Sequence, residues 1–208
     1  MTTLTIGTYT LDDTLTQQVR ENGEPGLHIY VPQHPVIVLG RSNKVDQELF
    51  EAAVLSDGVE VWRRKAGGGA VVLDPGNVIV SVAVPSKGIG HIDFYVDRIT
   101  TWFLAGLDAI GISGVRREGY SDLVIGDQKI SGSCMFNSRD LFYYSATLLC
   151  KPEVSLMERY LRHPPKEPDY RQGRPHRDFV RNLQEFPAAD SAQALANHLR
   201  QTLSAPEL

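Results

Sequence analysis

Hydrophobic residues recur along the chain with two different periods, and together these predict a mixed fold. Runs of β-branched and apolar residues predict strands at 3–10, 26–32, 35–39, 59–62, 70–73, 78–84, 122–125, 128–131 and 141–149. Apolar residues three to four positions apart predict helices at 11–21, 46–56, 91–110, 153–161 and 190–205. Hairpin-like connections around one long helix favour an α+β fold, with a largely antiparallel sheet flanked by helices.

Several local signals predict where these elements begin and end. Asp12 or Asp13 could cap the helix at 11–21. Residues 74–77, Asp-Pro-Gly-Asn, predict a type II turn in which the glycine adopts positive φ. Residues 126–127, Gly-Asp, predict a hairpin turn. Residues 162–177 are rich in proline, arginine and histidine and predict a surface loop, so we expect a single domain over residues 1–208.

Composition and charge narrow the classes of function. With 208 residues, 42% hydrophobic and 22% charged, the chain can bury a sizeable core. Its net charge of −4 gives no support for a general nucleic-acid binder. No apolar run is long enough to cross a bilayer, and the first residues do not resemble a signal peptide. Cys134 and Cys150 fit no zinc or disulfide pattern, so we expect a cytoplasmic protein without nucleic-acid or membrane partners.

A glycine run next to basic residues is the first candidate site. Residues 63–69 read Arg-Arg-Lys-Ala-Gly-Gly-Gly and lead into an apolar strand. Because glycine has no Cβ, main-chain N–H groups there can approach a ligand closely, and the basic residues suit a phosphate. The spacing matches neither a P-loop nor a dinucleotide fingerprint. A nucleotide-binding loop is one interpretation, and a simple glycine-rich turn with solvated basic residues is the other.

Lys129 is the second candidate. It follows the hairpin turn and precedes the small residues Ser131, Gly132 and Ser133, while Asp122 lies on the paired strand. A lysine placed at a cleft in this way could stabilise the charge that develops as pyrophosphate leaves an α-phosphate. The alternative is an ordinary exposed strand lysine. The six histidines show no metal-ligand spacing, and both cysteines are interpreted as buried small apolar residues.

Both candidates resemble the motifs of one family. Residues 63–77 resemble the signature Arg-Arg-x-Ser-Gly-Gly-Gly-x-Val-x-x-Asp-x-Gly-Asn of lipoate–protein ligases, and residues 121–123 with 129–133 resemble the second motif of that family. Residues 35–43 and 147–149 resemble two further family strands, so the likeness extends from about residue 10 to 186. It implies a biotin/lipoate ligase, class II synthetase-like fold. It also implies an enzyme that uses ATP and Mg²⁺ to form lipoyl-adenylate.

The resemblance also implies roles for individual residues. Lys129 would be the essential catalytic lysine at the adenylate, and Asn77 and Asp122 would lie at the nucleotide, with Asp122 also at the Mg²⁺ ion. The adenylate phosphate and acyl carbonyl would bind Arg64 and the main chain of Gly67, Gly68, Gly69, Ala70 and Val71. The acyl group would then pass to a lysine of a lipoyl-domain or H-protein-like acceptor.

Three residues depart from the family pattern where the acyl pocket is expected. Ala66 replaces a usual serine, while Leu73 and Ser145 stand where histidine is common. With Gly132, they predict a differently shaped acyl pocket, which could take lipoate, octanoate or a related acid. Larger ligases have a C-terminal accessory domain. Either this core suffices or a separate small accessory protein completes adenylation.

Two other functions compete with this reading. An octanoyltransferase or amidotransferase of the same superfamily would use a cysteine thioester, but neither cysteine stands at the expected place. A non-catalytic acyl- or nucleotide-binding protein would not need Lys129 and the triple glycine. Arg171, Arg174 and Arg177 favour a solvated loop that docks an acidic carrier domain over a nucleic-acid site.

Overall fold

Two β-sheets form the framework of the protein in a computed structural model that describes residues 3–207. The smaller sheet has the order β1 (Ile6–Thr8), β4 (Glu60–Arg63), β3 (Val36–Leu39) and β5 (Val71–Leu73). The larger sheet has the order β2 (Gly26–Tyr30), β6 (Asn77–Pro85), β10 (Leu141–Leu149), β9 (Gln128–Asn137), β8 (Asp122–Ile125) and β7 (Val115–Glu118). Every pairing in the larger sheet is antiparallel, whereas β1, β4 and β3 run parallel. The predicted α+β, largely antiparallel fold is confirmed.

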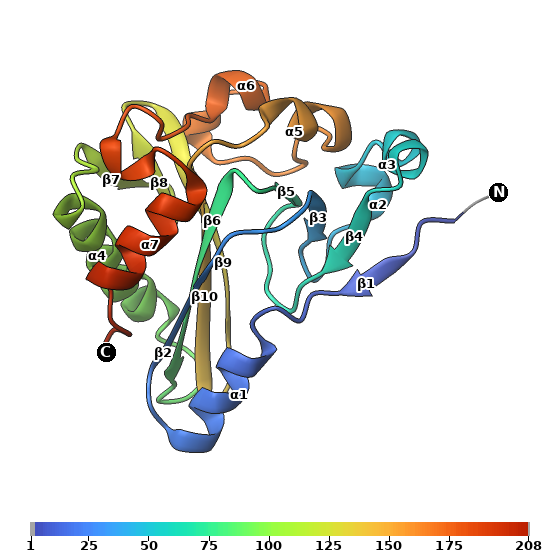
Figure 1. Cartoon of the computed structure of the whole chain (residues 1–208). Helices are drawn as coiled ribbons and strands as arrows, with labels where there is room; N and C mark the ends of the chain where they lie inside the picture. Colours follow the sequence, from blue (N-terminus) through green and yellow to red (C-terminus); the bar gives the residue numbers. More distant parts are fainter. Residues whose placement is uncertain (1–2, 208) are drawn as a thin grey trace.

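Helices cover the outer faces of this framework (Figure 1). They are α1 (Asp13–Asn22), α2 (Val45–Glu48), α3 (Glu51–Asp57), α4 (Ile92–Ala109), α5 (Val154–Tyr160), α6 (His176–Phe179) and α7 (Ala192–Thr202). Short 3₁₀ turns occur at η1 (Asp169–Arg171) and η2 (Pro187–Ala189). The main core packs α4 and α7 against the larger sheet, and a second core packs α3 and α5 against the smaller one.

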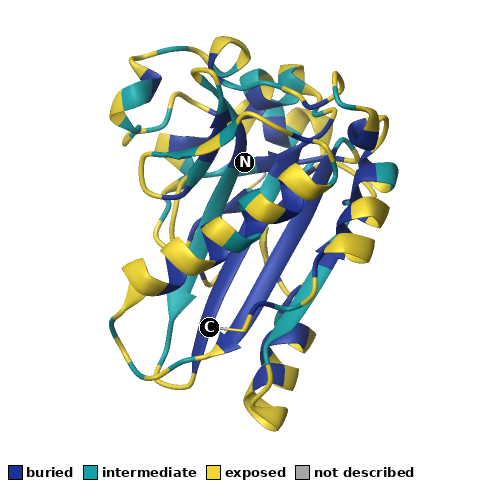
Figure 2. Cartoon of the chain, turned by 90° about the vertical axis from the view of Figure 1, so that its left-hand side faces the viewer, coloured by how far each residue is buried: buried dark blue, intermediate teal, exposed yellow. Residues whose placement is uncertain are grey.

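Strand β10 separates the main core from the space between the sheets. Successive side chains of a strand point to opposite faces. Phe142 and Tyr144 therefore face the main core, where Phe142 stacks on Tyr95 of α4 at a centroid distance of 4.5 Å. Tyr143 and Ser145 face the smaller sheet instead. Figure 2 shows two long strands, β6 and β10, buried along most of their length behind helices with exposed outer faces, while β9 is only half-buried. The space between the two sheets is where a ligand can be enclosed.

Some element boundaries differ from the sequence prediction. The expected helix at 46–56 is divided into α2 and α3, because Leu49 pairs with Leu161 and the Phe50 N–H donates to the Tyr160 carbonyl at 2.9 Å. The expected strand at 3–10 is limited to β1. Strand β7 was not predicted, because two arginines interrupt its apolar alternation. Strand β9 extends well beyond the predicted end at residue 131.

Two predictions about local conformation are wrong. Gly76 does not adopt positive φ, so residues 74–77 are not a type II turn. Glycine is required there because a Cβ would lie 1.8 Å from the Lys151 carbonyl oxygen. Asp12 precedes α1 without capping it. Its carboxylate instead turns inward and accepts hydrogen bonds from Ser81 and Tyr143.

Across residues 3–207, none of the helices combines the length and apolar character that a membrane span needs.

Candidate active site

A cavity of about 350 Å³ lies between the two sheets and contains both candidate motifs. One wall is formed by the glycine loop, the other by β9 and β10. The predicted site residues that line it are Arg64, Gly68, Gly69, Ala70, Val71, Leu73, Asp122, Lys129, Gly132 and Ser145. Segments more than fifty residues apart in the sequence therefore meet at one cavity.

Lys129 enters this cavity from the start of β9. Its ammonium lies 2.9 Å from Oδ1 of Asp122 on the neighbouring strand, and the Lys129 side chain is 24% exposed. The second carboxylate oxygen of Asp122 accepts a hydrogen bond from the Tyr170 hydroxyl at 2.8 Å. The Phe179 ring lies 5.9 Å from the ammonium. The expected cleft position of Lys129 is confirmed, with Asp122 as its ion-pair partner.

The basic residues before the glycines hold the main chain. Arg64 is 8% exposed and donates to the carbonyl oxygens of Gly67 at 2.8 Å, Gly69 at 2.7 Å and Val38 at 3.1 Å. Arg63 donates to the Gly40 carbonyl at 2.8 Å, and Lys65 pairs with an aspartate on α1. The interpretation of the basic residues as solvated neighbours of a turn is therefore wrong for Arg63 and Arg64, whereas the Lys65 side chain is exposed. Arg64 fixes the loop while its charge borders the cavity.

A buried glutamate, Glu48, also holds the glycine loop through hydrogen bonds. Oε2 of Glu48 accepts the Ala70 N–H at 3.1 Å, and its Oε1 accepts from the Asn43 side chain at 2.7 Å. The Asn43 Oδ1 in turn accepts the Gly40 N–H at 2.6 Å. The sequence reading missed Glu48. In the sequence, Glu48 is marked only by its position in an amphipathic stretch. A glutamate on the protein surface would have the same sequence pattern.

Gly40 directly follows β3 and lies close to Gly68. This close approach packs the glycine loop against the end of β3. A Cβ on Gly40 would lie 2.0 Å from the Gly68 carbonyl oxygen. Gly68 itself has a φ of 94°, a conformation that residues with a side chain rarely adopt. These two glycines are needed for the observed loop shape, whereas a Cβ on Gly67 would meet no atom within 4 Å.

Three predicted site residues lie outside this cavity. Gly67 belongs to the loop but does not line it. Asn77 is fully buried, and its side-chain oxygen accepts the Asp74 N–H at 2.8 Å. This geometry gives Asn77 a role in the turn and argues against the expected contact with a nucleotide. Ala66 is buried and borders a second, smaller cavity.

Residues 162–180 lie largely at the surface, as expected for 162–177, and they also close one side of the cavity. Lys166, Arg171 and His176 line it. Arg171 is only 4% exposed and lies over the Phe179 ring at 4.7 Å, so it is not solvated as expected. Arg174 donates to the Asp127 side chain at 3.0 Å and so ties this segment to the hairpin that precedes Lys129.

The lining of the cavity has an excess of positive charge. Its lining has five cationic side chains and two carboxylates, a difference of three positive charges: Arg64, Lys129, Arg162, Lys166 and Arg171 against Glu48 and Asp122. Burial, together with the Arg171 charge, lowers the pKa of His176 to about 4, so this imidazole is neutral at pH 7. Burial raises the pKa of the Cys134 thiol. Such a lining suits a polyanionic ligand.

No group of three or more histidine, cysteine, aspartate or glutamate side chains within residues 3–207 could by itself hold a metal ion. In the cavity, Asp122 offers carboxylate oxygens near Lys129. Mg²⁺ needs only one or two protein carboxylates when the phosphates of a substrate supply further oxygens. Asp122 fits such an arrangement.

Comparison with known proteins decides the family. The lipoyl protein ligase A/B catalytic domain matches residues 8–204. This chain belongs to that family. The match includes the glycine loop, Lys129 and the segment at 162–180.

Relatives and solved structures agree with the lipoyl protein ligase assignment. Lipoate–protein ligase 1 of Staphylococcus aureus is 25% identical over 179 residues, which cover 85% of this chain and 54% of that protein. A crystal structure of lipoate-protein ligase A bound with ATP has a TM-score of 0.75 at 19% identity, covering 92% of this chain and 76% of that one. The bi-partite ligase from Thermoplasma acidophilum, described with its E2 lipoyl domain, also has a TM-score of 0.75, at 18% identity and with coverage of 96% and 80%. The chain spans about half the length of the curated relatives it matches.

Gly40→Ala should destabilise the protein through the glycine loop. Its Cβ would overlap the Gly68 carbonyl oxygen, and overpacking of this kind costs about 1–3 kcal/mol of unfolding free energy. Urea denaturation measures the change. Gly67→Ala is the matched control, because its Cβ enters open space and should change stability by less than about 0.5 kcal/mol. Equal stability of the two variants would contradict the proposed close packing.

His176 should make the protein less stable as the pH falls. Its folded-state pKa of about 4 lies below the ordinary value of 6.5, so the unfolded chain takes up a proton first. Stability is therefore lost as the pH falls from 6.5 towards 4, and no contribution is expected above this window. Between pH 7 and pH 5 the wild type should lose on the order of 1 kcal/mol more than His176→Gln. Urea denaturation at both pH values tests this, and parallel losses would refute it.

Proposed function

We propose that this protein is an ATP-dependent lipoate–protein ligase. It activates lipoate or octanoate as an acyl-adenylate and transfers the acyl group to a lysine of a lipoyl-domain or H-protein-like acceptor. The observation that carries the proposal is one cavity whose lining combines an excess of cationic side chains with apolar side chains. Lys129 is among the cationic residues, and the apolar ones include Val38, Leu73 and Ile79.

The cationic side chains of the cavity suit the phosphates of ATP. In the first step a carboxylate oxygen of the acid attacks the α-phosphorus, the bond to the bridging oxygen breaks, and pyrophosphate leaves with the electron pair. The Lys129 ammonium would stabilise the charge that develops on the phosphate. When bound, Mg²⁺ would neutralise phosphate charge, with Asp122 as its protein ligand.

The second step needs positioning and no covalent enzyme intermediate. The amine of the acceptor lysine attacks the acyl carbonyl carbon, the bond to the phosphate oxygen breaks, and AMP leaves with the electron pair. The amine then loses a proton to solvent. The glycine loop, held by Arg64 and Glu48, would keep the acyl carbonyl in a fixed place, and such positioning supplies much of the rate.

The acyltransferase alternative is weaker on chemical grounds. A thioester intermediate needs a reactive thiolate, and Cys134 lines the cavity. Burial raises the pKa of its thiol, which favours the protonated, unreactive form. Cys150 is buried on the main-core side of the larger sheet. Both thiols are free, in keeping with a cytoplasmic setting.

We further propose that a separate small accessory protein assists adenylation. The ligase from Thermoplasma acidophilum, which shares the fold at a TM-score of 0.75, is described as bi-partite. The deciding assay incubates the purified protein with ATP, Mg²⁺ and either lipoate or octanoate, and then weighs a lipoyl-domain acceptor. A mass increase that requires ATP supports the ligase. Transfer from an acyl-carrier protein without ATP would support the acyltransferase instead.

Lys129→Ala should abolish acyl-adenylate formation while the protein remains folded. Loss of one preorganised donor to a developing negative charge lowers the rate by about 10²–10³-fold. Pyrophosphate release in the presence of ATP and octanoate measures this step, and circular dichroism checks the fold. Lys87→Ala, an exposed lysine outside the cavity lining, is the control. Normal pyrophosphate release by Lys129→Ala would disprove the assigned role.

A further inference from the structure

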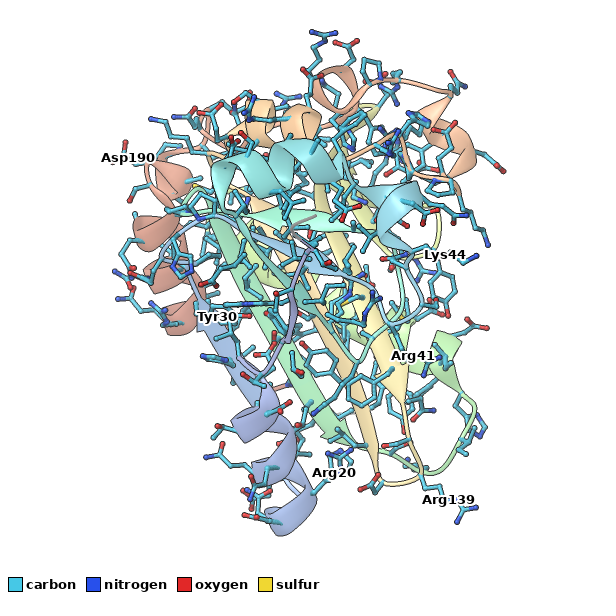
Figure 3. All side chains as sticks on the ribbon, turned by 90° about the vertical axis from the view of Figure 1, so that its right-hand side faces the viewer. Arg20, Tyr30, Arg41, Lys44, Arg139 and Asp190 are labelled. Carbon is cyan, nitrogen blue, oxygen red and sulfur yellow. The ribbon has the colours of Figure 1, made fainter. Side chains whose placement is uncertain are left out.

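A second cavity of about 280 Å³ adjoins the first. The two share three lining residues, Tyr9, Arg64 and Tyr143. The remaining residues of the second cavity are Asp12, Asp13, Thr16, Arg20, Lys65, Ala66 and Phe136. In Figure 3, Arg20 extends from α1 towards the turn between β9 and β10, where its Nε lies 2.9 Å from Asp140 Oδ2. The side chains of Tyr9 and Tyr143 therefore separate the cavity that contains Lys129 from a polar cavity near the surface.

The rings of Tyr9 and Tyr143, which we call the wall between the two cavities, are both held in place. The Tyr143 hydroxyl donates to Asp12 Oδ2 at 2.6 Å, and its ring stacks on Phe136 at a centroid distance of 5.0 Å. Burial raises the pKa of Tyr143, so the hydroxyl keeps the proton that this bond needs. The Tyr9 hydroxyl bonds to the Tyr30 hydroxyl. The rings are 6% and 9% exposed. Because they are fixed at both the ring and the hydroxyl, they cannot move aside freely.

The wall stands at the far end of the cavity from Lys129. On β9, Lys129 lies seven residues before Phe136, which pairs with Tyr143 on β10. At about 3.4 Å per residue, the strand covers about 24 Å over that distance. The glycine loop lies between these ends, since a Cβ on Gly68 would be 4.0 Å from the Ser133 carbonyl oxygen. A chain whose carboxyl group is activated at the loop would extend towards the two tyrosines.

We propose that Tyr143 and Tyr9 set the maximum chain length of the acyl substrate. Their rings end the acyl pocket and restrict it to acids of about the length of octanoate or lipoate. Removing a ring would join the two cavities and admit a longer fatty acid. In the joined cavity, Ala66 would line the acyl channel. This inference rests on the proposed ligase function and adds the residues that select among acids.

Tyr143→Val tests the wall, and Tyr143→Phe is its matched control. The first removes the ring, while the second removes only the hydroxyl. We would measure kcat/KM for adenylation of octanoate and of dodecanoate by trapping the acyl group with hydroxylamine. The ratio of dodecanoate to octanoate should rise at least about tenfold in Tyr143→Val, because space for even one methylene changes discrimination by that amount. Tyr143→Phe should keep the wild-type ratio.

Two further measurements keep the test decisive if Tyr143→Val does not fold. Tyr9→Val, outside the strands, should shift the ratio in the same direction. The wild type, tested with saturated acids from hexanoate to tetradecanoate, should lose activity sharply beyond octanoate. Two results would overturn the role of the tyrosines in chain length while leaving the proposed function intact. One is a folded valine variant that activates octanoate with an unchanged dodecanoate-to-octanoate ratio. The other is a wild type that uses tetradecanoate as well as octanoate. A wild type that activates no acid would overturn the proposed function as well.

Discussion

The geometry of the site depends on one guanidinium group inside the glycine loop. Arg64 donates to carbonyl oxygens of Gly67, Gly69 and Val38, and so joins the loop to β3. Hydrogen bonds from a charged donor are stronger than neutral ones, contributing about 1.5–3 kcal/mol each. Because these carbonyls are bound by Arg64, the loop keeps one shape without a ligand. Such preorganisation reduces the ordering that binding would otherwise require.

The sequence contained enough information to predict the two halves of the site. The glycine run and Lys129 are local signals, since small residues, charge and strand ends can be recognised within a few positions. The sequence also placed Asp122 on the strand paired with that of Lys129, and the two side chains form an ion pair at 2.9 Å. The meeting of the two motifs followed only from the family resemblance, because the residues between them are arranged by tertiary packing.

What the sequence could not reveal are contacts between residues far apart in the chain. Asp12 looked like a helix cap, yet its partners are Ser81 and Tyr143, 69 and 131 residues away. Arg171 looked like a solvated loop residue, yet it is buried against Phe179. In both cases local propensity is weaker than the tertiary environment. A charged side chain has the same sequence signature whether it ends a helix, faces water or braces a cavity.

Asp12 brings together a group of polar side chains next to the Tyr143 hydroxyl. A buried carboxylate is costly unless several donors surround it, and here they are the Tyr143 and Ser81 hydroxyls and the His28 ring. These donors come from β10, β6 and β2, so one carboxylate next to α1 joins three strands of the larger sheet. A buried polar cluster adds little net stability compared with apolar packing, but it can fix a unique arrangement. At this position the arrangement that it fixes is the packing of α1 against β2, β6 and β10.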